Sequence, residues 1–180
     1  MAPDSLQLDA WLPDPAVRVV HRRQSSASPE RLWQAAHEIR LSDTRVLGRL
    51  VRWRIPGLAA RASFYDIFRH DPFMAITESD GALVSGLVGR IWTLRRDYPK
   101  LGDVDQYREW STPGTAKVLF ANWVEPVRPG HAALSAEVRV QAFGTQGRIG
   151  LTSVRPMIRA FQGLVGSEAL AAAVRRAECR

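Results

Sequence analysis

Two kinds of spacing between apolar and polar residues organise the first third of the chain. Apolar and basic residues alternate over 16–24, which predicts a first strand. Ser28-Pro29-Glu30 combines a capping serine, a proline at the first helical position and an acid in the first turn, so a helix begins there. Ser42 begins a second helix that Pro56-Gly57 must end, and the capping spacing in 63–69 predicts a short third one.

From residue 71 onward the period shortens to two. Phe73–Glu78 and Ala82–Ile91 flank Ser79-Asp80-Gly81, and Asp-Gly between apolar runs is a strong hairpin signal. The segment Thr93–Ser111 is polar and irregular, and it is long enough to form a lid or to hold a short edge strand.

A second hairpin is predicted where Thr115–Glu125 and His131–Ala142 flank Pro126–Gly130. With the turn centred near Arg128, Phe120 lies opposite Ala136. One face is then nearly all apolar and belongs on a core or a cavity: Val118, Phe120, Asn122, Leu134, Ala136 and Val138. The other face carries Lys117, Leu119, Glu137 and Arg139. For Glu137 and Arg139 we expect outward charges on a strand, with an inward ligand clamp as the alternative.

Residues 144–180 have apolar faces at helical spacing, with Pro156 expected to kink or interrupt the helix and Gly163 and Gly166 to loosen it. The length of 180 residues suits one domain over 16–178, preceded by a loose segment over 1–15.

Composition narrows the class of protein. The chain is 46% hydrophobic and 24% charged, which is typical of a globular domain and excludes disordered, collagen-like and disulfide-framework classes. The net charge is +7, from 23 arginines and two lysines against 18 acids. Arg45, Arg49 and Arg52 fall on one helical stripe, with a second face of apolar residues expected to meet the core: Val46, Leu47, Leu50 and Val51. No nucleic-acid motif accompanies them, so a nucleic-acid partner is not favoured.

The sequence contains none of the common motifs for metal binding, hydrolysis or nucleotide binding. The four histidines show no metal-ligand spacing, and there is no hydrolase elbow, phosphate-binding loop or dinucleotide fingerprint, so we expect no cofactor. The lone Cys179 and the absence of an apolar run in Met1–Asp14 lead us to expect a cytoplasmic protein. The longest apolar stretches, such as Ala82–Gly89, are too short to span a membrane. The oligomeric state is not indicated.

The order of elements resembles the START-like helix-grip superfamily (SRPBCC, which includes polyketide cyclases/dehydrases and lipid-transport proteins), and most of all its bacterial members of unassigned function. Four segments carry the resemblance: 28–33 after the first strand, 86–92, 113–117 and 134–140. It implies an α+β fold in which a curved antiparallel sheet wraps a long C-terminal helix around a cavity. The extended glycine-rich loop of plant members is replaced here by Ser79-Asp80-Gly81, so no phosphate-binding role is carried over.

On this interpretation the protein binds a hydrophobic small molecule or lipid in a cavity between the sheet and the C-terminal helix. The candidate cavity residues are Arg90, Trp92, Tyr98, Trp110, Phe120, Asn122, Met157 and Phe161. A cyclase/dehydratase-like enzyme that uses the same cavity is one alternative, with Asn122, Arg90, Tyr98 and Tyr65 as its polar groups. The other alternative is an adaptor that docks on anionic surfaces through Arg45, Arg49 and Arg52. A binding protein is favoured over an enzyme.

Overall fold

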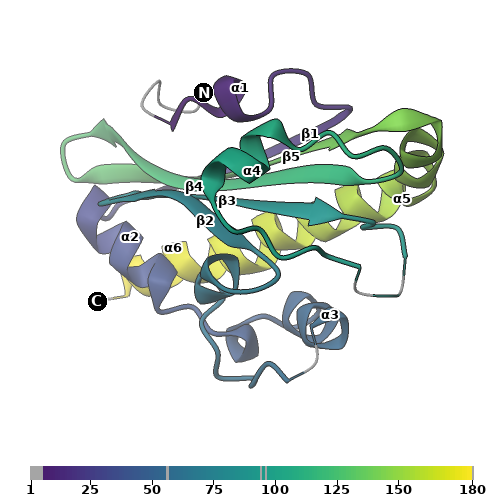
Figure 1. Cartoon of the computed structure of the whole chain (residues 1–180). Helices are drawn as coiled ribbons and strands as arrows, with labels where there is room; N and C mark the ends of the chain where they lie inside the picture. The colour runs from purple at the N-terminus through teal and green to yellow at the C-terminus, as the bar shows by residue number, and fades with distance from the viewer. Residues whose placement is uncertain (1–5, 56, 94, 96, 180) are drawn as a thin grey trace.

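The computed structural model describes residues 6–55, 57–93, 95 and 97–179. Within them, five strands form one antiparallel sheet in the order β1-β5-β4-β3-β2, with helices on both sides (Figure 1). The strands are β1 (Val17–Ser25), β2 (Met74–Ser79), β3 (Ala82–Gly89), β4 (Ala116–Arg128) and β5 (His131–Ala142). The α-helices are α1 (Leu8–Trp11), α2 (Pro29–His37), α3 (Leu47–Arg54), α4 (Val104–Glu109), α5 (Gly144–Leu164) and α6 (Leu170–Glu178). This is the α+β helix-grip arrangement that the sequence predicts.

The two faces of the sheet are covered by different parts of the chain. The inner face, which includes Phe120 and Val138, packs against α2, α5 and α6. The outer face, which includes Leu119 and Ala121, is covered by α1 and α4. Ser28 caps α2 as predicted, because its hydroxyl accepts a hydrogen bond from the backbone N–H of Arg31.

The β4–β5 hairpin has the predicted faces in a different register. Phe120 pairs with Val138, and Asn122 pairs with Ala136. The strands run on to a tight turn at Pro129-Gly130, with a bulge between Pro126 and Arg128. The turn centre therefore moves by one residue and every partner moves by two. Because the side-chain period of a strand is also two, no residue changes face.

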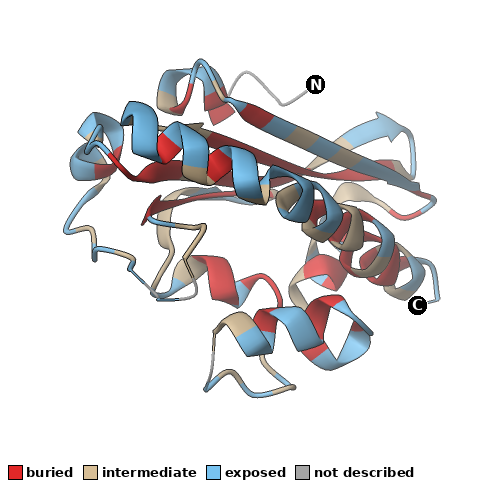
Figure 2. Cartoon of the chain, turned by 90° about the vertical axis from the view of Figure 1, so that its right-hand side faces the viewer, coloured by how far each residue is buried: buried red, intermediate tan, exposed pale blue. Residues whose placement is uncertain are grey.

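The terminal helix lies along the inner face, with a buried stripe toward the sheet and an exposed outer surface (Figure 2). Pro156 lies inside α5 without ending it. The departure from α-helical geometry comes later, at the π-type turn η4 (Val165–Ala169). Here Gly166 packs on His21, and a Cβ on Gly166 would lie 2.7 Å from the imidazole ring. The close approach of helix and strand requires glycine at this point.

The second predicted helix is shorter than expected. Leu41–Asp43 forms the 3-10 turn η2, the backbone is extended at Thr44, and α3 begins only at Leu47. The carboxylate of Glu168, from η4, accepts hydrogen bonds from the backbone N–H groups of Val46 and Leu47 at 3.0–3.1 Å. The start of α3 is therefore fixed by the terminal helix. The predicted third helix is the 3-10 turn η3 (Asp66–Arg69).

The segment 93–111 contains a helix where a lid or an edge strand was expected. Asp103 caps α4 by accepting a hydrogen bond from the backbone N–H of Gln106 at 2.8 Å. The ring of Tyr107 is buried against the outer face, where a Cβ on Gly86 would lie 2.5 Å from it. The segment therefore covers the sheet on the side away from the terminal helix.

The expectation of solvent-facing charge at Glu137 and Arg139 is wrong. Both side chains point to the outer face, but they are only 1% and 4% exposed. The Glu137 carboxylate accepts from Arg139 at 2.6 Å and from Arg18 at 2.8 Å, and Arg139 also bonds Asp9 and the Leu12 carbonyl. The segment around α1 covers this network, so the pair forms no ligand clamp toward the terminal helix.

Candidate functional site

Polar side chains on the inner face lack hydrogen-bond partners in the part of the chain that the structure describes. Asn122, on the central strand β4, is fully buried, and neither its amide nitrogen nor its oxygen is bonded. On β3 the buried hydroxyl of Ser85 is likewise unpartnered. Asn122 pairs with Leu83, two residues from Ser85, so the two polar groups are diagonal neighbours on one face. Each unsatisfied buried group costs about 1–3 kcal/mol.

Three more side chains carry a buried, unpartnered group. They are the Gln162 side-chain oxygen on α5, the Tyr65 hydroxyl before η3, and Nε2 of His21, which shares a sheet row with Asn122. Burial raises the pKa of Tyr65 far above its ordinary range, so its hydroxyl stays protonated and can donate. Burial, with a contribution from the positive charge of Arg23, lowers the pKa of His21 and favours its neutral form. The inner face therefore offers neutral donors and acceptors.

Aromatic side chains connect this face to one edge of the sheet. The rings of Phe120 and Phe68 stack with centroids 3.9 Å apart and an interplanar angle of 11°. Phe68 in turn meets Phe73 edge-on at 5.0 Å. Phe73 lies just before β2, the edge strand, so a continuous apolar path runs from the central strand to the edge.

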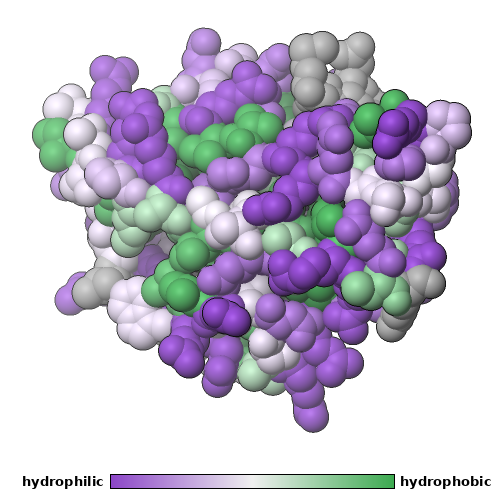
Figure 3. Space-filling view, turned by 180° about the vertical axis from the view of Figure 1, so that it is seen from behind, coloured by the Kyte–Doolittle hydropathy of each residue, from purple (hydrophilic) through white to green (hydrophobic). Residues whose placement is uncertain are grey.

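Hydrophobic patches on the surface seen from behind are divided by hydrophilic side chains (Figure 3). A hollow of about 900 Å³ lies beside β2, the edge strand, and we call it the β2-edge cleft. Ala75 lines it and is the cross-strand partner of Ser85, so the cleft adjoins the inner face. Its lining residues are Arg54, Ile55, Arg69, His70, Asp71, Pro72, Phe73, Met74, Ala75, Tyr98, Pro99, Lys100 and Leu101.

Charged groups stand around the rim of the β2-edge cleft. Arg54 donates to the Thr93 carbonyl at 2.9 Å and to the Tyr98 hydroxyl, and its guanidinium lies 5.3 Å from the centre of the Tyr98 ring. Lys100 pairs with Asp71 at 3.3 Å. These contacts connect the end of α3 to the segment around Tyr98, so two separate parts of the chain form the cleft wall.

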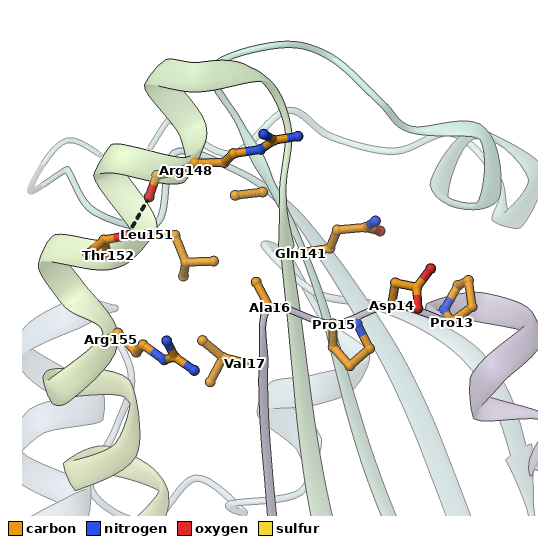
Figure 4. Close-up of a pocket in the computed structure, with 11 residues that line it drawn as sticks. Pro13, Asp14, Pro15, Ala16, Val17, Gln141, Arg148, Leu151, Thr152 and Arg155 are labelled. Carbon is orange, nitrogen blue, oxygen red and sulfur yellow. Dashed lines mark hydrogen bonds between the residues drawn. The ribbon is translucent and has the colours of Figure 1, made fainter.

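A smaller groove of about 430 Å³ lies at the opposite edge of the sheet, between the start of β1 and α5 (Figure 4). Arg148 and Arg155 project over it from α5, and Val17 and Gln141 lie on the strand side. None of the unpartnered groups described above lines either hollow, but Ala75 in the β2-edge cleft is the cross-strand partner of Ser85, and this groove has no such neighbour of Ser85 or Asn122. We therefore take the inner face and the β2-edge cleft as the candidate site.

Five of the eight candidate cavity residues lie on or beside the inner-face core or the cleft. Phe120 and Asn122 are on the inner face, and Tyr98 lines the β2-edge cleft. Trp92 and Phe161 are partly buried against the same core.

Three candidates are placed elsewhere. Arg90 follows the end of β3, is exposed, and has its guanidinium 3.6 Å from the Asp97 carboxylate. Trp110 packs on the outer face, because α4 carries it there, and donates to the Thr115 hydroxyl at 2.9 Å. Met157 is 60% exposed on the outer side of α5. These three side chains therefore lie off the inner face and outside the lining of the β2-edge cleft.

Sequence reasoning missed Ser85, Gln162 and Arg54. Ser85 stands in an otherwise apolar strand, and this was an available signal for a polar inner-face group. Gln162 is three residues before the apolar Val165, so helical spacing places it on the same buried face, and this spacing was an available signal. Arg54 carries no local signal, since its partners Thr93 and Tyr98 are about 40 residues away along the chain.

Comparison with known proteins gives only distant likenesses. No protein-family model matches the chain, and no curated protein matches it. Among solved structures, a hypothetical protein from Helicobacter pylori is 10% identical over 99% of this chain and 95% of its own, with a TM-score of 0.42. A Thermus thermophilus protein is 11% identical over 89% and 97%, with a TM-score of 0.33. An aromatase/cyclase from a Streptomyces species is 15% identical over 89% and 94%, with a TM-score of 0.37. Likenesses at this level assign neither a family nor a function to the chain.

Among the described residues, none of the helices has the length and apolar character needed to cross a membrane.

Proposed function

We propose that this protein binds a hydrophobic small molecule or lipid between the inner face and the terminal helix, with the β2-edge cleft as the route of access. The observation that carries the proposal is Asn122. Its amide is fully buried on the inner face and has neither donor nor acceptor satisfied among the described residues. A ligand carbonyl or hydroxyl placed there would satisfy it.

Two apolar side chains that remain partly exposed support the proposal that a ligand fits at the inner face. Val118 belongs to the central strand β4 and shares the inner face with Phe120, yet it is only partly buried. Phe161, on the terminal helix, is also only partly buried. Incomplete burial of apolar side chains on the strand and on the helix supports looser packing between these two elements. Apolar walls with a few fixed polar groups are the usual construction of small-molecule sites.

A titration with cis-parinaric acid, a fluorescent fatty acid, tests the proposal. Saturable binding is expected, and Asn122→Leu, which removes the amide at similar volume, should weaken it. A matched pair of serines provides the control. Ser85→Ala on the inner face and Ser135→Ala on the outer face each remove one buried, unpartnered hydroxyl from the same sheet.

The expected result is that Ser85→Ala changes the affinity for the probe and Ser135→Ala does not. Absence of saturable binding by a folded sample, or equal effects of the two serine variants, would overturn the proposal. Thermal melting of each variant establishes that it is folded.

The enzyme alternative needs an acid–base pair at the inner face. Tyr65 and His21 are titratable groups with buried polar atoms. The pKa of Tyr65 is raised, which keeps its hydroxyl protonated, and the pKa of His21 is lowered, which keeps its ring unprotonated, so both stay neutral. No hydrogen bond within the described residues joins them to each other. No observation favours this second function, and we propose binding alone.

A further inference from the structure

Helix α3 has an apolar outward side in addition to its buried one. Leu47 and Val51 pack into the core, as the sequence predicts. The same expectation is wrong for Val46 and Leu50, which are 49% and 39% exposed, and Trp53 is 65% exposed. Val46, Leu50 and Trp53 are spaced by four and three residues, so they form one stripe along the solvent side of the helix.

Three arginines run beside that stripe. Arg45, Arg49 and Arg52 are exposed, and no ion pair or hydrogen bond of their side chains is present among the described residues. At about 100° per residue, Arg49 and Trp53 are neighbours on the helix surface. Arg49 and Arg52 therefore occupy one flank of the outward side of α3 and Leu50 and Trp53 the other, with Arg45 and Val46 just before the first turn. We call these six residues the α3 surface.

We propose that the α3 surface docks on a membrane that contains anionic phospholipids. Arginines attract anionic headgroups, and each one near the membrane surface strengthens binding about fivefold. Tryptophan favours the level of the headgroups, where its ring is partly buried and its N–H stays hydrated. A helix with this combination lies in the plane of the interface.

Charge complementarity and the exposed apolar residues together favour a membrane over other occupants. A nucleic-acid backbone would engage the arginines but leave Val46, Leu50 and Trp53 in water. A second copy of the chain would place like-charged arginines against one another if the contact were symmetric.

Docking has a consequence that rests on the proposed function. Arg54, the last residue of α3, and Ile55 line the β2-edge cleft. A membrane bound to the α3 surface would therefore lie close to the cleft through which we propose that the ligand enters.

Vesicle co-sedimentation tests the docking without any added ligand. The full chain should bind vesicles of equal parts phosphatidylglycerol and phosphatidylcholine, should not bind pure phosphatidylcholine, and should be released as ionic strength rises from about 0.1 M to about 1 M. The double variant Arg49→Gln/Arg52→Gln should bind about 25-fold more weakly. Its matched control, Arg148→Gln/Arg155→Gln, removes the same charge from exposed arginines of α5 and should bind as the parent does.

The apolar flank is tested by Trp53→Ser, which keeps the charge and should also weaken vesicle binding. Equal losses in the two arginine pairs would show a general charge effect and overturn the proposal. So would an unchanged affinity of Trp53→Ser, or a Trp53-dependent dimer in sedimentation velocity. Loss of vesicle binding with retained binding of cis-parinaric acid would separate this inference from the proposed function.

Discussion

Replacing Glu137 by glutamine tests the buried charge network of the outer face. The Glu137 carboxylate accepts from two arginines at 2.6–3.2 Å and is 1% exposed. Glutamine keeps one acceptor but removes the negative charge, which leaves the Arg139 guanidinium, 4% exposed, with only Asp9 and the Leu12 carbonyl. Breaking such a buried pair lowers the free energy of unfolding by about 3–5 kcal/mol.

For a chain of this length, that loss lowers the melting temperature by roughly 6–20 °C. Differential scanning calorimetry at neutral pH measures it. Arg18→Gln is the comparison, because the Arg18 side chain is 51% exposed and water already screens its contact, so the loss should be below about 1 kcal/mol. The apolar double variant Glu137→Leu/Arg139→Met should be more stable than Glu137→Gln. A melting temperature for Glu137→Gln close to that of the parent, or equal losses in Glu137→Gln and Arg18→Gln, would refute the reasoning.

Three further changes probe other parts of the fold. Tyr65→Phe removes a buried, unpartnered hydroxyl, so it should leave the urea midpoint unchanged or raise it, and a clear drop would reveal a partner. Glu168→Ala removes the cap of α3 and should cost about 0.5–2 kcal/mol, with faster hydrogen exchange confined mainly to α3; uniform acceleration would contradict this. The pKa of His21 is lowered in the folded chain, so the unfolded chain binds more protons just below pH 6.5. Stability should therefore fall as pH drops through that value, and His21→Asn should show a smaller fall in urea titrations.

Local spacing was enough to place the strands and their faces. The alternation that predicts strands at 16–24 and around the two turns depends only on neighbouring residues, and the structure has strands there. The faces of the β4–β5 hairpin were also predictable, since a strand repeats every two residues. Its register was not, because the bulge between Pro126 and Arg128 depends on how the turn closes.

The sequence did not predict which side chains are buried under distant segments of the chain. Glu137 is buried because Leu6–Leu12, far away in sequence, crosses the outer face above it. Trp110 packs on that face because α4 turns it there. Met157 is exposed because the sheet lies on the opposite side of α5. Periodicity groups residues on a common face, but it does not state which segment, if any, packs against that face.

The sequence by itself determined an α+β chain with two hairpins, a capped helix after the first strand and a long terminal helix, because each of these depends on residues within a few positions of one another. It also placed Phe120 and Asn122 on one face. Only the tertiary structure decided that Asn122 has Ser85 as its diagonal neighbour, that Arg54 and Tyr98 meet at the β2-edge cleft, and that Trp53 faces solvent. These features depend on contacts between distant segments, and the side-chain pattern of one segment does not specify its partner.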